Sequence, residues 1–158
     1  KTFGRLKVAG PAVAKAYFRV DENILDDSGF FDTGDVATID ANGYMQITDR
    51  SKDVIKSGGE WISSIDLENL AIGHPDVMEA AVIGIAHPKW DERPLLVVVA
   101  KEGRQISREN VLEFMQGKIA KWWLPDDVQV VKEIPHTATG KINKVTLREQ
   151  FSEYKFPG

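Results

Sequence analysis

The triplet Thr33-Gly34-Asp35 places a carboxylate directly after a glycine, at the end of the turn-rich residues 29–35. An ionised carboxylate only accepts hydrogen bonds, so Asp35 could accept two of them from a vicinal diol such as that of a ribose. Taken alone, however, the triplet favours a simpler interpretation, a polar turn between two strands. The diol-binding interpretation therefore needs support from elsewhere in the chain.

A second segment combines backbone freedom with bulk, because Gly58 and Gly59 are followed by Glu60 and Trp61. Two adjacent glycines let the backbone approach a ligand closely or take φ and ψ values that other residues avoid. The indole of Trp61 could wall a tunnel or stack on a flat group. A glycine turn beside a packed indole is the alternative, and it is slightly favoured without further context.

The third segment, residues 134–144, carries Lys141 directly after Gly140. It superficially resembles a phosphate loop, but that motif needs a glycine and a hydroxyl residue where Pro135 and Ile142 stand, so we reject it. What remains is a lysine on a flexible loop, suited to bringing one positive charge to a developing anion. An ordinary solvated surface lysine is the alternative.

Composition excludes several classes of protein. The 158 residues carry a formal net charge of -4 with the basic residues scattered, so we expect no nucleic-acid partner. The chain has no cysteine, and its histidines, His74, His87 and His136, have no companions at ligand spacing, so we expect no metal site. No apolar run approaches the roughly 20 residues of a membrane span.

Two regions with different patterns must position these residues. Short alternating strands with turns at Gly10-Pro11 and Asn42-Gly43 predict a small antiparallel sheet before residue 50. Beyond it, helices capped by Ser64 and Ser107 alternate with strands at 77–85, 95–100 and 128–131, the first two separated by a loop at 87–94. A last helix is expected from about 143 to 154. The boundary belongs in the charged cluster 49–53.

Taken together and in this order, the three segments resemble the adenylate-forming superfamily of acyl-CoA synthetases, luciferases and peptide-synthetase adenylation domains. Residues 49–53 resemble the hinge of that family, and residues 56–69 with 87–94 look most like medium- and long-chain fatty acid–CoA ligases. The resemblance implies an α+β fold. Residues 1–49 would be the β-rich end of the large N-terminal AMP-binding domain, and residues 50–158 the C-terminal lid.

The resemblance also implies a role for each matching residue. Asp35 and Arg50 would bind the nucleotide ribose, Lys52 would be the hinge pivot, and Lys141 would bridge carboxylate and phosphate during adenylation. The face that meets CoA during thioester formation would comprise Lys56, Gly58, Gly59, Glu60 and Trp61. Rotation about Lys52 would remove Lys141 and bring in the glycine edge, so that one centre serves two reactions in turn.

The implied protein is an ATP-dependent fatty acid–CoA ligase with ATP, CoA and a fatty acid as substrates. Mg²⁺ would be bound mainly by a larger N-terminal part that these residues do not include, so the chain alone is expected to be inactive. We expect a cytoplasmic location, with peripheral membrane association as an alternative, and leave a homodimer open. Two rival functions remain: another acid–thiol ligase of the superfamily, and a non-catalytic interaction module that keeps the lid fold.

Overall fold

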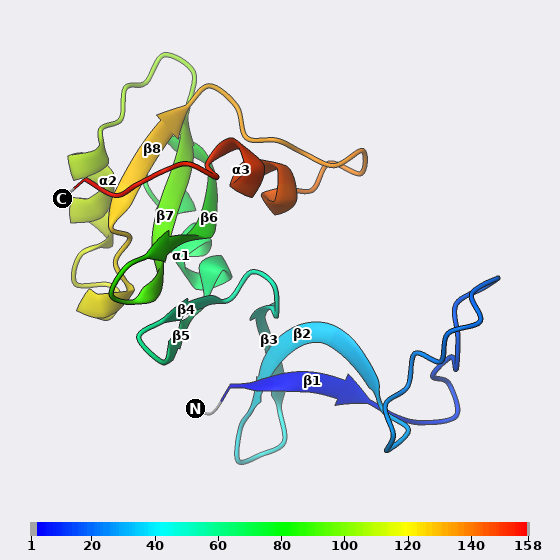
Figure 1. Ribbon diagram of the computed structural model, residues 1–158. Helices are drawn as coiled ribbons and strands as arrows, with labels where there is room; N and C mark the ends of the chain where they lie inside the picture. The colour runs from blue at the N-terminus through cyan, green and yellow to red at the C-terminus, as the bar shows by residue number, and fades with distance from the viewer. Residues whose placement is uncertain (1–2, 158) are drawn as a thin grey trace. The chain divides into compact units, whose positions relative to one another are not determined.

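The computed structural model describes residues 3–157, which form two compact units (Figure 1). Unit 1 is Lys1–Lys52 and unit 2 is Asp53–Gly158. The predicted boundary after residue 49 lies close to this division. The assignment of the two parts to the AMP-binding domain and lid of a larger enzyme stays a prediction.

Unit 1 contains a three-stranded antiparallel sheet in the order β1 (Gly4–Val8), β2 (Phe31–Ile39) and β3 (Met45–Arg50). The expected small antiparallel sheet is therefore confirmed. The β2–β3 turn forms as the sequence predicts, because Gly43 takes a positive φ of 85° and its N–H donates to the Asp40 carbonyl.

Unit 2 is built on a five-stranded sheet. Its strands are β4 (Ile55–Ser57), β5 (Glu60–Ile62), β6 (Val77–His87), β7 (Asp91–Ala100) and β8 (Asp127–Val131). The order is β5-β4-β7-β6, all antiparallel, and β8 pairs with β7 in parallel. The central strands β6 and β7 are almost continuously apolar because both faces of the sheet are covered.

Successive side chains of β6 and β7 enter two different cores, as the period of a strand requires. Val82 and Leu96 belong to the cluster covered by α1 (Ser64–Ile72) and α2 (Arg108–Met115). Ile83 and Leu95 belong to the cluster on the other face, with Leu147 of α3 (Lys144–Gln150). The expected α+β fold is confirmed.

Three local expectations were wrong: the loop at 87–94, the cap of α1 and the end of the last helix. The predicted loop 87–94 is mostly strand, since β6 and β7 pair from Val77↔Ala100 to His87↔Asp91. Pro94 itself lies in β7, paired with Gly84. The cap of α1 is Ser63, not Ser64, because the Ser63 side chain accepts from the Asp66 N–H and Ser64 is already the first residue of the helix. Ser107 does cap α2.

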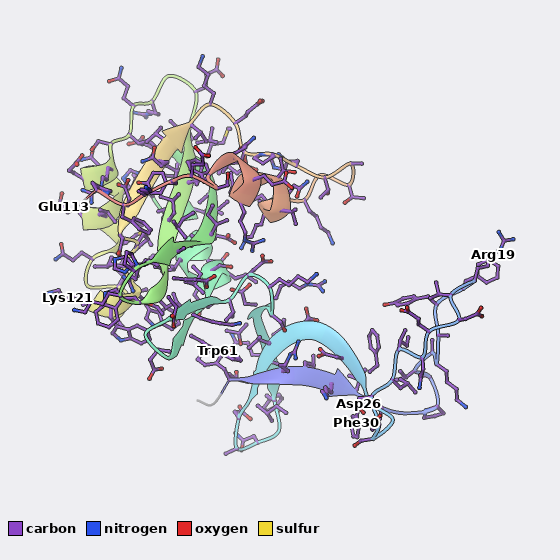
Figure 2. The ribbon with its side chains drawn as sticks, in the orientation of Figure 1. Arg19, Asp26, Phe30, Trp61, Glu113 and Lys121 are labelled. Carbon is purple, nitrogen blue, oxygen red and sulfur yellow. The ribbon has the colours of Figure 1, made fainter. Side chains whose placement is uncertain are left out.

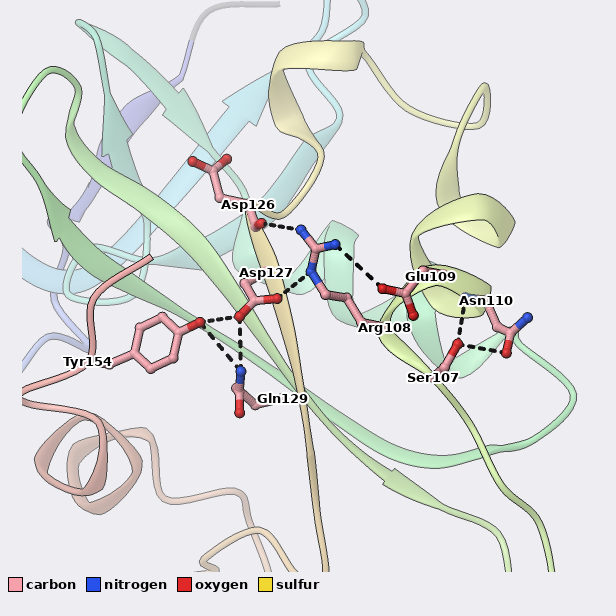
Figure 3. A network of polar contacts seen from close by, with 8 residues as sticks. All are labelled: Ser107, Arg108, Glu109, Asn110, Asp126, Asp127, Gln129 and Tyr154. Atoms are coloured by element: carbon pink, nitrogen blue, oxygen red, sulfur yellow. Dashed lines mark hydrogen bonds and ion pairs between the residues drawn. The ribbon is translucent and has the colours of Figure 1, made fainter. Parts of the chain in front are cut away.

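The last helix ends at Gln150, several residues before Tyr154. Past that point the Tyr154 hydroxyl donates a hydrogen bond to the buried carboxylate of Asp127, which also accepts from Arg108 and Gln129 (Figure 3). The Tyr154 ring packs edge-on against Phe151 and Phe156. Leaving the helix allows the aromatic residues of this tail to cover the core. Among residues 3–157, no helix has the length and apolar composition that crossing a membrane requires.

Candidate active site

Asp35 and Arg50 lie opposite each other on neighbouring strands of unit 1. The register of β2 and β3 pairs them directly, and Arg50 Nε lies 3.0 Å from Asp35 Oδ1. Gly34 takes a φ of 75°, and the Thr33 hydroxyl accepts from the Asp35 N–H. Residues 33–35 lie within β2 and not in a turn between strands, so the strand backbone and its pairing with β3 set the direction of the Asp35 carboxylate. The structure brings these two predicted nucleotide contacts together, while their role stays a prediction.

Lys52 lies in the turn of residues 51–53 at the division between the units. The next residue, Asp53, is held in unit 2 by an ion pair with Arg148 of α3. The backbone therefore leaves β3 at Arg50 and is fixed again at Asp53. The hinge role of Lys52 stays a prediction.

The predicted CoA face is the β4–β5 hairpin. Gly58 and Gly59 are its two turn residues, with φ of 57° and 85°, as in the tight turns that suit twisted hairpins. A Cβ on Gly58 would lie 2.9 Å from Cε3 of Trp90, whereas a Cβ on Gly59 would meet no atom within 4 Å. The double glycine is thus required by the local backbone, and Gly59 also leaves open space.

The other three predicted residues of this face belong to the same hairpin. Lys56 is paired with Trp61 across β4 and β5, and Glu60 is exposed beside the turn. Trp61, labelled in Figure 2, is half-buried. The hairpin therefore places all five predicted CoA-face residues within one turn and its flanking strands.

A pocket of about 370 Å³ opens beside this turn and contains residues that the sequence did not point to. Its lining is Ser57, Gly58, Glu60, Trp90, Arg93, Trp122 and Asp126. Trp90 and Trp122 are 42% and 46% exposed, so their rings are available to a ligand. The pocket joins the predicted CoA face to two aromatic walls.

Arg93 organises that pocket and is only 11% exposed. Its guanidinium forms an ion pair with Asp126 at 2.6 Å and donates to the Ser57 hydroxyl at 3.0 Å. It also donates to the carbonyls of Trp122 and Leu124 at 2.9 and 3.0 Å. Arg93 belongs to residues 87–94, a segment already singled out from the sequence. The sequence did not indicate that its partners come together from β4 and from residues 122–126, called the 120s segment below.

Lys141 lies on residues 136–142, called the arm below, which projects past α3 in orange in Figure 1. The arm is closed by a bridge between His136 and Ile142 and by the Thr137 N–H donating to the Lys141 carbonyl at 2.7 Å. Gly140 completes the turn with a φ of 80°. Lys141 is exposed, and its ammonium has no hydrogen bond or ion pair with residues 3–157.

The structure does not bring Lys141 close to the glycine turn. The arm and the β4–β5 hairpin extend from different sides of unit 2, well apart in Figure 1. Both belong to the unit that begins at Asp53. Within residues 3–157, no group of three or more histidine, aspartate or glutamate side chains could hold a metal ion, so no step below depends on Mg²⁺ bound by these residues.

Comparisons with known proteins now decide the family. Residues 66–141 match the profile described as AMP-binding enzyme C-terminal domain. These residues therefore belong to the family of AMP-binding enzyme C-terminal domains. The predicted resemblance is confirmed at this level.

The curated relatives of this C-terminal domain are acyl-CoA ligases. The chain is 56% identical over 153 residues to the 3-methylmercaptopropionyl-CoA ligase of Ruegeria pomeroyi and covers 28% of that protein. It is 48% identical over 157 residues to the long-chain-fatty-acid–CoA ligase of Thermus thermophilus and covers 29% of it. These alignments include 97% and 98% of this chain. The chain itself spans under a third of the length of each relative.

A solved structure supports the same fold. ATP-bound MatB from Rhodopseudomonas palustris matches with a TM-score of 0.86 at 35% identity, over 98% of this chain and 31% of that one. The C-terminal fold assigned from the profile therefore agrees with the fold found by superposition.

Proposed function

We propose that this chain is the C-terminal part of an ATP-dependent acid–CoA ligase, comprising the end of its large domain in residues 1–49 and its lid in residues 50–158. The observation that supports this most is that Lys141 and the Gly58-Gly59 turn lie at separate places on one compact unit, which begins directly after Lys52. Rotation of such a unit about Lys52 presents either group to one reaction centre. The larger part of the enzyme supplies the rest of that centre.

In the first half-reaction a carboxylate oxygen attacks the α-phosphorus of ATP, and the bond to the leaving pyrophosphate breaks. Negative charge then develops on oxygens of both the carboxylate and the phosphate. The exposed ammonium of Lys141, on an arm whose residues 136–142 include no aspartate or glutamate, bridges these oxygens in the transition state. Its stabilisation of the adenylation step is the chemistry this chain supplies first.

In the second half-reaction the CoA thiol attacks the acyl carbon, AMP leaves, and the thiol proton is released. The Gly58-Gly59 turn then replaces Lys141, and the open space at Gly59 lets the thin pantetheine arm pass along the backbone. The adjoining pocket suits the flat adenine of CoA, which stacks against Trp90 and Trp122. Lys89, whose ammonium lies 4.7 Å from the Trp90 ring centroid, adds positive charge for CoA phosphates.

The acid substrate is proposed to be a medium- or long-chain fatty acid. The 56% identity to a ligase named for 3-methylmercaptopropionate favours a second candidate, a short sulfur-containing acid. The rates of CoA thioester formation by the complete protein with octanoate, palmitate and 3-methylmercaptopropionate distinguish the two. A cytoplasmic location and a homodimer stay predictions.

The test of the catalytic proposal uses a complete enzyme in which this chain replaces the aligned segment of the R. pomeroyi ligase, called the chimera below. Lys141→Ala should lower the rate of ATP–pyrophosphate exchange by roughly a hundredfold to a thousandfold, the usual effect of losing one preorganised donor. CoA thioester formation from supplied acyl adenylate should change little.

The matched control is Lys132→Ala, which removes another exposed lysine of the same unit and should leave both rates unchanged. Equal loss of both half-reactions in Lys141→Ala would contradict the proposal. A chimera that folds but forms no CoA thioester would favour the non-catalytic module.

A further inference from the structure

The arm that carries Lys141 has one apolar anchor, Ile142, which packs against the core cluster that includes Leu147. Residues 136–141 are all exposed, and the nearest buried side chain before them is Ile134, which is 2% exposed. After the arm, Lys144 fixes the start of α3 through Glu68 at 2.7 Å and the Ser64 hydroxyl at 2.6 Å. The C-terminal end of the arm is thus held firmly. The position of Lys141 then depends on what holds the N-terminal end of the arm.

The N-terminal end of the arm, at His136, is held by a contact to the central sheet. His136 Nε2 lies 2.5 Å from Oε1 of Glu79, a residue of β6 that is paired with Val99. The side chains of His136 and Glu79 are 38% and 25% exposed. Glu79 therefore offers a partly shielded carboxylate on a strand that cannot move independently of the core.

The contact is transmitted to Lys141 through the backbone of the arm. His136 forms the bridge with Ile142, the residue that follows Lys141. The next rung joins the Thr137 N–H to the Lys141 carbonyl at 2.7 Å, and the Thr137 hydroxyl accepts from the Lys141 N–H at 3.2 Å. Fixing His136 consequently fixes the backbone on both sides of Lys141.

We propose that His136 and Glu79 are positioning residues for the adenylation half-reaction, holding the arm so that the Lys141 ammonium reaches the reacting oxygens. The proposal rests on the adenylating role of Lys141 proposed above. Neither residue touches substrate. Their effect is on geometry, to which rates are sensitive, since a misplacement of about 1 Å can lower a rate roughly a hundredfold.

Two alternative roles of the His136–Glu79 contact, orienting the arm and merely stabilising the fold, can be distinguished by experiment. A partly exposed polar contact such as that of His136 with Glu79 contributes little to the free energy of unfolding, whether or not it is an ion pair. Its loss would therefore leave the melting temperature nearly unchanged while freeing the arm. Because the arm acts only in the adenylating pose, the loss should fall on one half-reaction alone.

The experiment compares Glu79→Ala, His136→Ala and the double variant in the chimera. Each single change should lower the rate of ATP–pyrophosphate exchange about tenfold. This loss is larger than the small energy of an exposed contact would cause, and smaller than the roughly hundredfold loss caused by a full misplacement of the reacting group. The double variant should be no worse than either single variant, because both remove the same contact. Thioester formation from supplied acyl adenylate should stay within about twofold of the parent rate in all three.

Two further variants make the result specific. His136→Lys supplies an N–H donor that can reach Glu79 and should retain most of the adenylation rate. Glu133→Ala removes an exposed carboxylate just before the arm, for which no ion pair is found within residues 3–157, and should change neither rate.

Unchanged adenylation in the single variants, additive losses in the double variant, or equal losses in both half-reactions would overturn the positioning proposal. Lys141→Ala, measured in parallel, separates this from failure of the proposed function. If Lys141→Ala abolishes adenylation but Glu79→Ala does not, only the positioning proposal fails. If Lys141→Ala leaves adenylation intact, both fail.

Discussion

Arg50 Nε lies 3.0 Å from Asp35 Oδ1, so two residues expected to contact the same ribose form one ion pair on neighbouring strands. The Asp35 side chain is 18% exposed and that of Arg50 is 65% exposed. The carboxylate is consequently oriented from one side by the strand register and from the other by the guanidinium. An oriented carboxylate loses less freedom when a diol binds.

Asp35→Asn should therefore weaken nucleotide binding more than it weakens the fold. We expect the KM for ATP of the chimera to rise roughly tenfold, because an amide accepts hydrogen bonds from a diol less strongly than a carboxylate. The melting temperature should hardly change, because the Arg50 guanidinium is largely solvated and an amide at position 35 can still accept a hydrogen bond from it. Asp40→Asn, in the turn of the same sheet, is the control and should leave the KM unaltered. A similar rise in both variants would argue against a ribose contact at Asp35.

Gly59→Leu should impair thioester formation and spare adenylation. The added side chain would fill the space that is open next to the Gly59 backbone. Gly103→Leu is a matched control, because Gly103 also has a positive φ, 70°, and open surroundings. Both variants should lose about 1 kcal/mol of stability from backbone strain. Only Gly59→Leu should slow CoA thioester formation from supplied acyl adenylate, and equal losses in exchange and ligation would refute the assigned role.

Lys144→Met should destabilise unit 2 by about 3 kcal/mol, because it removes the Lys144 ammonium from the largely buried carboxylate of Glu68. The side chains of Lys144 and Glu68 are only 12% and 14% exposed. Adding Glu68→Gln should recover part of the loss, since a neutral amide can still accept from the Val82 N–H. Denaturant unfolding of the chain and its variants measures both effects. A loss under about 0.5 kcal/mol in Lys144→Met would mean that the pair is more solvated than its burial indicates.

The contact between Tyr154 and Asp127 should make stability depend on pH at the alkaline end (Figure 3). Burial, and then the hydrogen bond to Asp127, raise the pKa of Tyr154 from 10.0 to about 12. The native state therefore keeps the phenol proton where the unfolded state has lost it, so stability is complete below pH 10 and falls between about pH 10 and 12. In Tyr154→Phe this component of alkaline unfolding should vanish.

The acid limb has the opposite sign. Burial alone would raise the pKa of Asp127, but hydrogen bonds from Tyr154, the Val128 N–H, Gln129 and Arg108 outweigh it and lower the pKa below 3.8. The corresponding stability is present above pH 3.8 and is lost as the pH falls through the lowered value. Asp127→Asn should flatten this part of the acid unfolding curve, measured by circular dichroism. An unchanged curve would show that the cluster is not linked to folding.

The sequence by itself determined the features that depend on neighbouring residues. The turns at Asn42-Gly43 and Gly58-Gly59, the cap at Ser107 and the exposed loop around Lys141 follow from backbone preferences and local hydrogen bonds. The order of the three motifs was enough to indicate the family. Ser63 and Ser64 show the limit of local reasoning, because both could cap α1 and both are buried, and only the backbone path at the start of the helix lets the Ser63 side chain accept from the Asp66 N–H.

Tertiary structure decided which distant residues meet. Asp35 meets Arg50 because of the register of β2 and β3, and His136 meets Glu79 because the arm passes over β6. The convergence of β4, β7 and the 120s segment on Arg93 depends on sheet order. Cross-strand register and the packing of helices on a sheet are set by burial summed over many residues. Local propensity contains no record of them, which is why the glycine turn was found in the sequence and the pocket beside it was not.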